Sequence, residues 1–254
     1  MPMPERAATE ADEIHRQLLT AVTAERAAAS KAYLKLDHLE FTGASVPQAR
    51  AAVVAWRRAQ TDLDRSHLLA VVESLWSRPV FECRLAAVIM LTDRRQLLGA
   101  TDMELVERLL RESGTWALVD SLASDVAGSL AGRFDELGGT LDRWAADEDF
   151  WIRRSAMLAL LVPLRRGEVA NFERFGGYAD QMLDEREFFI RKAIGWVLRE
   201  TAKRQPQLVI DWLGPRAHRA SGVTMREAVK YLPAGDRDKL IAAYRDRRLL
   251  SPGP

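Results

Sequence analysis

A carboxylate and an indole lie four residues apart near the middle of the chain, in the segment 116–120. Side chains four residues apart are neighbours on a helix surface, so Trp116 and Asp120 would lie side by side at the edge of an apolar stripe. Thr115 can cap the start of that helix. A fixed carboxylate can stabilise positive charge that develops in a reaction. An edge-of-core tryptophan beside a solvated aspartate explains the same spacing.

A second row combines one aromatic residue with three cations. It occupies positions i, i+4, i+7 and i+11 of a predicted helix and consists of Lys192, Trp196, Arg199 and Lys203. The core-facing side of the helix carries Phe189, Ile190, Ala193, Ile194, Val197 and Thr201. Such a row suits nucleic acid, with the cations on phosphates and the indole against a sugar or base. A solvated basic face is the alternative interpretation.

The charge of the chain is divided unevenly along its length. Residues 1–150 contain 17 Lys and Arg against 24 Asp and Glu, whereas residues 151–254 contain 20 against 12. The C-terminal part is therefore basic, which favours contact with a polyanion. Within it, the mostly apolar segment 150–158 carries Arg153 and Arg154, and at least one of them is expected at a groove or an interface. An ion pair inside the protein explains these arginines as well as phosphate does.

Several classes of protein lack their signatures here. Cys83 is the only cysteine, which excludes a disulfide framework and a cysteine-based metal site and fits a small core residue. The four histidines are scattered, and nucleotide-binding and serine-hydrolase motifs are absent. We therefore expect no metal and no organic cofactor. Without a signal-like N-terminus or an apolar run of about 20 residues, we expect a cytoplasmic protein with no membrane contact.

A short unit recurs along the chain and sets the expected fold. Helices are predicted to begin near Pro47, Val80, Thr115, Phe150, Phe188 and Val223, at intervals of 33 to 38 residues. Second helices are predicted over 66–76 and 102–111, with turns at 77–79, 113–114, 138–139 and 214–215. No segment alternates with period two, so no sheet is expected. The pattern predicts an all-α fold, an α-solenoid of HEAT-like repeats with a concave binding face.

This pattern also predicts the organisation of the chain. We expect a single domain over residues 1–254. Residues 1–44 would form an N-terminal helical segment, one long helix or a helix pair over 6–36, and residues 45–235 would form the repeats. Residues 250–254 are expected to fray. Trp56, Trp76, Trp144 and Trp212 have no polar row around them and are expected to pack in the core.

Four segments, in the proper order, resemble the AlkD-type DNA alkylation repair glycosylases, which are bacterial HEAT-like repeat proteins. They are Trp116-x-x-x-Asp120, Trp151-x-x-Arg154, the helix 189–200 around Trp196, and Arg226-Glu227-Ala228. The resemblance covers about residues 45–235, and the helix around Trp196 is its most specific part. Two positions depart from the family pattern: Thr115 replaces an aromatic residue and Val162 replaces a lysine. Both could alter substrate shape or DNA affinity.

The resemblance implies a monofunctional glycosylase that releases N3- or N7-alkylated purines from double-stranded DNA, with no obligatory protein partner and as a monomer. Asp120 would be the catalytic carboxylate, and Trp116 and Trp196 would hold the damaged nucleotide. The cations expected to face DNA are Arg153, Arg154, Lys192, Arg199 and Lys203. A shallow site would accept bulky adducts of a DNA-alkylating natural product, which would make the protein a self-resistance enzyme.

Two other functions fit the same residues. A non-catalytic member of the superfamily would bind branched or damaged DNA through the basic row and would not need Asp120. A HEAT-like scaffold without a nucleic-acid role would bind peptides on its concave face. Release of a free base separates the first function from both alternatives, and a steep fall of DNA affinity with salt separates DNA binders from the scaffold.

Overall fold

The computed structural model describes residues 2–20 and 23–250, and side chains up to residue 246. These residues form helices joined by short turns, and no β-strand occurs among them; an isolated parallel bridge joins Glu40 and Val80. The prediction of an all-α fold is confirmed. Of the tail 250–254, only Leu250, the last residue of α16, lies within the described residues.

The chain divides into two compact units, residues 1–122 and 123–254, and each is described by itself. The first contains α1 (Met3–Leu19), α2 (Ala24–Leu34), α3 (Val46–Arg58), α4 (Arg65–Trp76), α5 (Phe81–Asp93), α6 (Met103–Ser113) and α7 (Trp116–Ser121). The second contains α8 (Gly128–Ala131), α9 (Gly138–Ala145), α10 (Phe150–Leu158), α11 (Leu161–Arg166), α12 (Ala170–Met182), α13 (Phe188–Ala202), α14 (Pro206–Leu213), α15 (Gly222–Ala228) and α16 (Ala234–Leu250). The prediction of one domain stays a prediction.

The predicted helix starts are confirmed to within one residue. The corresponding helices begin at Val46, Phe81, Trp116, Phe150, Phe188 and Gly222, and the N-terminal segment is a pair, α1 and α2. Side-chain caps explain four of these starts, because an N-cap oxygen satisfies an amide that the helix leaves unpaired. The capping residues are Thr115, Asp149, Glu187 and Ser221. One turn prediction is wrong: Gly138 and Gly139 open α9, directly after a 3₁₀ turn at Asp135–Leu137.

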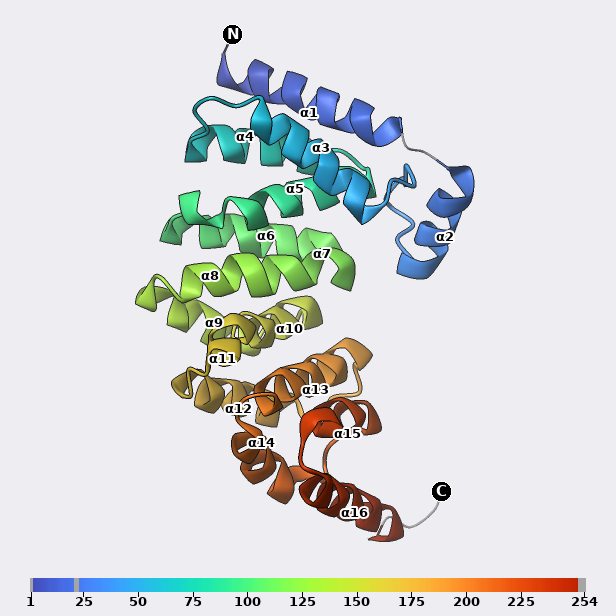
Figure 1. Ribbon diagram of the computed structural model, residues 1–254, viewed down its shortest axis with the longest axis vertical. Helices are drawn as coiled ribbons and strands as arrows, with labels where there is room; N and C mark the ends of the chain where they lie inside the picture. Colours follow the sequence, from blue (N-terminus) through green and yellow to red (C-terminus); the bar gives the residue numbers. More distant parts are fainter. Residues whose placement is uncertain (1, 21–22, 251–254) are drawn as a thin grey trace. The chain divides into compact units, whose positions relative to one another are not determined.

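In the first unit, α4 packs between α1 and α5, and α3 packs on α5 (Figure 1). A partly buried polar cluster joins three of these helices, α1, α3 and α4. The carboxylate of Glu10 accepts hydrogen bonds from the Trp56 indole at 2.7 Å and from Arg6 at 2.9 Å, and lies 2.8 Å from the ring nitrogen of His67. Burial disfavours the charged form of Glu10, but these hydrogen bonds outweigh it, and the pKa of Glu10 lies below its ordinary value.

The loop before α3 is held to α5 by a buried carboxylate. Glu82, which is 1% exposed, accepts hydrogen bonds from the backbone amides of Thr42 and Gly43, each at 2.9 Å. Two backbone hydrogen bonds between Glu40 and residues 79 and 81 complete the connection. Because both amides are buried, no solvent replaces the carboxylate if it is lost.

In the second unit, α13 packs closely along α15 (Figure 1). The contact passes through Gly195, where a β-carbon would lie 2.7 Å from Cβ of Glu227 and 3.0 Å from the carbonyl oxygen of Thr224. The hydroxyl of Thr224 donates a hydrogen bond to the carbonyl of Arg191 at 3.1 Å. Only a residue without a side chain permits this helix separation.

The remaining packing predictions concern single residues. Cys83 is fully buried, as predicted, and its burial raises the pKa of the thiol to about 12. Trp56, Trp76 and Trp144 are buried core residues, also as predicted. Trp212 is half-buried, and its ring lies 6.2 Å from that of Phe175.

We predict that Glu82→Gln lowers the free energy of unfolding by about 2 kcal/mol, because an amide has only one acceptor oxygen for two buried donors. Urea unfolding of the whole protein measures the change. The matched control is Glu104→Gln, at an exposed position of the first turn of α6. Equal stabilities of the two variants would contradict the anchoring role of Glu82.

We predict that Gly195→Ala destabilises the protein by about 1–3 kcal/mol, although alanine is the better helix former, because the added methyl group has no space against α15. Gly177→Ala is the control, since Gly177 lies within α12 and a methyl group added there would have no atom within 4 Å. That control should be neutral or slightly more stable. Unfolding midpoints in urea compare the two, and a neutral Gly195→Ala would refute the close approach.

Candidate functional site

Trp116 and Asp120 lie one turn apart on α7, where the first unit meets solvent. Trp116 is 37% exposed and Asp120 is half-buried, whereas Leu118 and Val119 on the other side of the helix are fully buried. The Thr115 hydroxyl accepts a hydrogen bond from the amide of Ala117 and fixes the first turn. The structure therefore brings these two predicted residues together at the edge of the core.

Tyr33 is a neighbour of this pair that the sequence did not indicate. It lies at the end of α2, is 72% exposed, and meets Trp116 edge to face with ring centroids 6.2 Å apart. Such a contact stabilises the orientation of the indole, since aromatic edges carry positive and faces negative partial charge. Two exposed aromatic rings thus lie in contact, and one of them is a single helical turn from Asp120.

The backbone after Asp120 departs from the α-helix. A π-helical turn spans Leu122–Ala127 and follows α7 directly. In a π turn each hydrogen bond encloses one more residue, so the faces before and after it are offset. Asp120 is therefore in the last α-helical turn before this offset.

Trp196 and the predicted basic row lie on α13 in the second unit. Trp196 is half-buried and follows Gly195, the residue at which α13 contacts α15. Lys192 and Lys203 are each a little over 40% exposed, and Arg199 is 24% exposed. The structure confirms that these side chains share one side of the helix, but it also gives each cation an acid.

Glu227 of α15 holds two of the cations. Its carboxylate accepts a hydrogen bond from Lys192 on one oxygen and from Arg199 on the other. Burial alone would raise the pKa of Glu227, yet the hydrogen bond from Lys192 and the charge of Arg199 lower it below its ordinary value. Two positive groups thus converge on one anion, which is the arrangement that a phosphate would also satisfy.

Glu200 on α13 itself holds the other end of the row. It accepts hydrogen bonds from Lys203 at 2.8 and 2.9 Å and from Arg165 of α11 at 3.1 Å. Burial opposes its ionisation, but Lys203 and Arg165 outweigh that effect and the pKa of Glu200 is lowered. The ammonium group of Lys203 also lies 5.1 Å from the ring centroid of Tyr231.

Arg154 of α10 is a buried residue of this cluster. It is 2% exposed, and its guanidinium donates a hydrogen bond to the carbonyl of Phe189 at 2.6 Å. The guanidinium carbon lies 6.0 Å from the Trp196 ring centroid and 5.9 Å from that of Phe189. In this structure Arg154 packs against the Trp196 ring, because a guanidinium over an aromatic face is attracted to it.

Arg153, its neighbour, forms an ion pair across the repeat. Its guanidinium binds both carboxylate oxygens of Glu185, at 3.0 and 2.8 Å, and also the carbonyls of Asp147 and Glu148. Of the two explanations left open for the consecutive arginines, the internal ion pair describes Arg153 here. Sequence reasoning missed Glu185, Glu200 and Glu227, since nothing local distinguishes a paired glutamate from a solvated one.

The predicted residues thus form two sets, Trp116 with Asp120 in the first unit and Trp196 with the cations in the second. Over residues 2–20 and 23–250, no group of three or more His, Cys, Asp or Glu side chains is arranged to hold a metal ion. None of the described helices is both long and apolar enough to cross a membrane.

Solved structures that resemble this chain include the following three. A predicted DNA alkylation repair enzyme from Enterococcus faecalis is 25% identical, with a TM-score of 0.73 over 84% of this chain and 97% of that one. AlkD2 from Streptococcus mutans is 15% identical, with a TM-score of 0.56 over 75% and 91% of the two chains. The protein smu.31 from Streptococcus mutans UA159 is 14% identical, with a TM-score of 0.55 over 74% and 93%. The latter two establish the likeness of the fold alone, which is that of paired HEAT-like helices.

The search of curated proteins gave no match. A family model gives the assignment. The model described as "DNA alkylation repair enzyme" matches residues 14–232, a range that includes Trp116, Asp120, Arg154 and Trp196. Because this match spans most of the chain, the protein belongs to the DNA alkylation repair enzyme family.

Proposed function

We propose that the protein is a monofunctional DNA glycosylase that hydrolyses the N-glycosidic bond of N3- or N7-alkylated purines in duplex DNA. The observation that carries this proposal is the Trp116–Asp120 pair, half-exposed on one turn of α7 in a chain of this family. The reaction would use no metal or organic cofactor, and a monomer would suffice. A substrate of chromosomal DNA would place the activity in the bacterial cytoplasm.

The proposed chemistry needs little more than a positioned carboxylate. Alkylation at N3 or N7 makes the purine cationic, so the bond to C1′ breaks with its electron pair passing to the base, which leaves neutral. Positive charge then develops on the sugar, where Asp120 would stabilise it. Water adds to C1′ and gives its proton to Asp120 or to solvent. The products are the free alkylated base and an abasic site.

The size of this stabilisation predicts the substrate class. A carboxylate about 4 Å from the developing charge contributes about 4 kcal/mol at an effective dielectric constant near 20. If all of it acts in the transition state, the rate rises by about three powers of ten. That is adequate for a bond already weakened by alkylation and inadequate for an intact nucleoside. Selectivity for cationic lesions would follow from the lability of the substrate.

The aromatic residues would bind the cationic nucleotide through their electron-rich faces, at about 0.5–2 kcal/mol each. We assign this role to Trp116 and Trp196. Because Trp116 and its neighbour Tyr33 are open to solvent, they do not enclose the base on all sides. Such walls would tolerate bulky adducts, including those of a DNA-alkylating natural product.

The cations would hold the DNA backbone at the expense of their present partners. A phosphate approaching Lys192 and Arg199 competes with Glu227, and one approaching Lys203 competes with Glu200. Arg153 and Arg154 would have to leave Glu185 and the Phe189 carbonyl to reach DNA. Arg199 and Lys192 are therefore the first candidates for phosphate contact.

We predict that Asp120→Asn binds alkylated duplex DNA as the wild type does but releases base about 10³-fold more slowly, because the neutral amide cannot stabilise the sugar cation. Single-turnover release of 3-methyladenine, 7-methylguanine and one bulky N3 or N7 adduct measures the rate. Asp211→Asn, at an exposed position of α14, is the control. Release by Asp120→Asn at the wild-type rate would exclude the catalytic assignment.

We predict that Glu227→Gln binds duplex DNA more tightly than the wild type and with a steeper salt dependence, because Lys192 and Arg199 lose their competing anion. The same variant should lose about 1 kcal/mol of stability at pH 7. The pKa of Glu227 in the folded protein lies below its ordinary value of 4.5. The stability difference between the wild type and Glu227→Gln is therefore fully present above about pH 4.5, and it is lost as the pH falls through the lower pKa of the folded state.

Fluorescence anisotropy of a labelled duplex at several salt concentrations checks the affinity, and urea unfolding at pH 7 and at a series of pH values below 4.5 checks the stability. Glu173→Gln, an exposed change on α12, controls for net charge. Unchanged affinity in Glu227→Gln would mean that Lys192 and Arg199 serve only as structural partners of α15.

A further inference from the structure

Three arginines of the first unit surround a pocket between the ends of α3 and α5. The pocket has a volume of about 330 Å³ and is lined by Val53, Val54, Trp56, Arg57, Arg58, Met90, Asp93 and Arg94. We call it the arginine pocket. Within the described parts of the chain, the guanidinium groups of Arg57, Arg58 and Arg94 form no ion pair, in contrast to Arg153 or Arg199.

Arg57 carries the clearest unmet bonding capacity. Its Nε is buried and has no hydrogen-bond partner, and its terminal nitrogen reaches only the Gln60 carbonyl, at 3.5 Å. A buried charged donor without an acceptor costs about 1–3 kcal/mol or more. An anion in the pocket would remove that cost.

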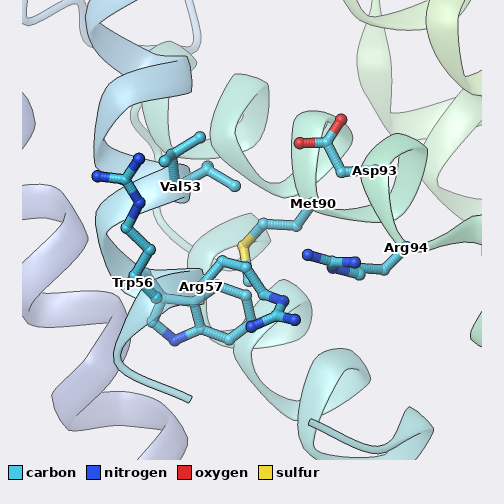
Figure 2. Close-up of a pocket in the computed structure, with 8 residues that line it drawn as sticks. Val53, Trp56, Arg57, Met90, Asp93 and Arg94 are labelled. Atoms are coloured by element: carbon cyan, nitrogen blue, oxygen red, sulfur yellow. The ribbon is translucent and has the colours of Figure 1, made fainter. Parts of the chain in front are cut away.

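Arg94, which follows the last residue of α5, lines the same pocket. In Figure 2 the guanidinium groups of Arg57 and Arg94 lie on the same side of Met90, whereas the Asp93 carboxylate points away from them. Among the described residues, the carboxylate of Asp93 forms no ion pair with Arg57 or Arg94 within 4.0 Å. Arg57 and Arg94 also line a neighbouring hollow, together with Thr61, Asp62 and Asp64.

Helix dipoles explain part of this arrangement, because cations are favoured near the C-terminus of a helix: Arg57 and Arg58 lie in the last turn of α3, and Arg94 follows α5 directly. However, the helix dipole would stabilise these arginines equally well if their side chains were exposed to solvent. It does not require Nε of Arg57 to be buried, nor two guanidinium groups to line one cavity. A ligand with negative charge accounts for both features.

We propose that the arginine pocket binds a phosphate group through Arg57 and Arg94, with the organic part of the ligand against the exposed side chain of Val54 and the edge of Trp56. Guanidinium forks match two oxygens of a phosphate, and the apolar floor favours a phosphate ester over a bare ion. A volume of about 330 Å³ is within the range of small-ligand sites. The ester is either a backbone phosphate of duplex DNA, which would extend the proposed function, or a free phosphomonoester.

The test compares the wild type with Arg57→Gln/Arg94→Gln in the full chain. The probes are an undamaged 20-base-pair duplex, deoxyadenosine monophosphate and inorganic phosphate. The control, Arg16→Gln/Arg108→Gln, removes two exposed arginines that are paired with acids. Arg57→Lys/Arg94→Lys keeps the charge and loses the fork. Unfolding midpoints of all variants establish that each is folded, and Arg94→Gln alone serves if the double variant is not.

If the ester is DNA, we expect duplex affinity to fall at least about tenfold and the salt slope to decrease by about two in the glutamine variant, one for each phosphate contact. The lysine variant should retain the slope with intermediate affinity. If the ester is a free phosphomonoester, deoxyadenosine monophosphate binding disappears and duplex affinity is unchanged. Binding of all three probes equal to that of the control would overturn the proposal.

Base release separates this proposal from the proposed function. At saturating DNA, the glutamine variant should release alkylated base at the wild-type rate, because neither arginine belongs to the proposed catalytic set. If the wild type releases no base, yet binds duplex or nucleotide through Arg57 and Arg94, the glycosylase proposal is wrong and the phosphate-site proposal stands. The reverse result would sink only the phosphate site.

Discussion

The absence of a side chain at Gly195 is the constraint on which the arrangement of the second unit's basic row depends. It lets α15 approach α13 until Glu227 lies between Lys192 and Arg199. Trp196 follows directly in the chain, and its indole lies against the guanidinium of Arg154. The aromatic group and the cations are thus fixed by packing between helices, and such packing has few alternative arrangements.

Local pairing of charges decides where an anion can bind, and regional net charge does not. Residues 151–254 are basic, yet Lys192, Arg199 and Lys203 of the basic row and Arg153 of α10 all have glutamate carboxylates as partners. Residues 1–150 are acidic, yet Arg57 and Arg94 face a pocket without an ion-pair partner among the described residues. A polyanion would have to displace carboxylates in the first case and would meet open donors in the second. Charge counts along a sequence cannot distinguish these situations.

The sequence predicted the helices well because their signals are local. Apolar periodicity and caps such as Asp149 and Ser221 act within a few residues, and the helix starts agree to within one position. The turn at Gly138-Gly139 failed because glycine is tolerated in the first turn of a helix. Contacts between helices that are distant in the chain leave no such local pattern in the sequence. Tyr33 of α2 meets Trp116 of α7 although they are 83 positions apart in the chain, so no local pattern indicates the contact.

The buried position of Arg154 shows the same limit of sequence-based prediction, since a long cationic side chain is equally compatible with solvent and with a hydrogen bond to a carbonyl.

The exposure of Asp120 to water determines how much its charge can contribute to the reaction. Asp120 is half-exposed, and in bulk water a carboxylate about 4 Å from a positive charge contributes only about 1 kcal/mol, against about 4 at an effective dielectric constant of 20. The difference corresponds to about two powers of ten in rate. A bound duplex that covers Asp120 and excludes water would supply that difference. Trp116, one turn from Asp120, and Tyr33, which contacts Trp116, would then contribute to the chemical step if they help to shield the carboxylate as well as to bind.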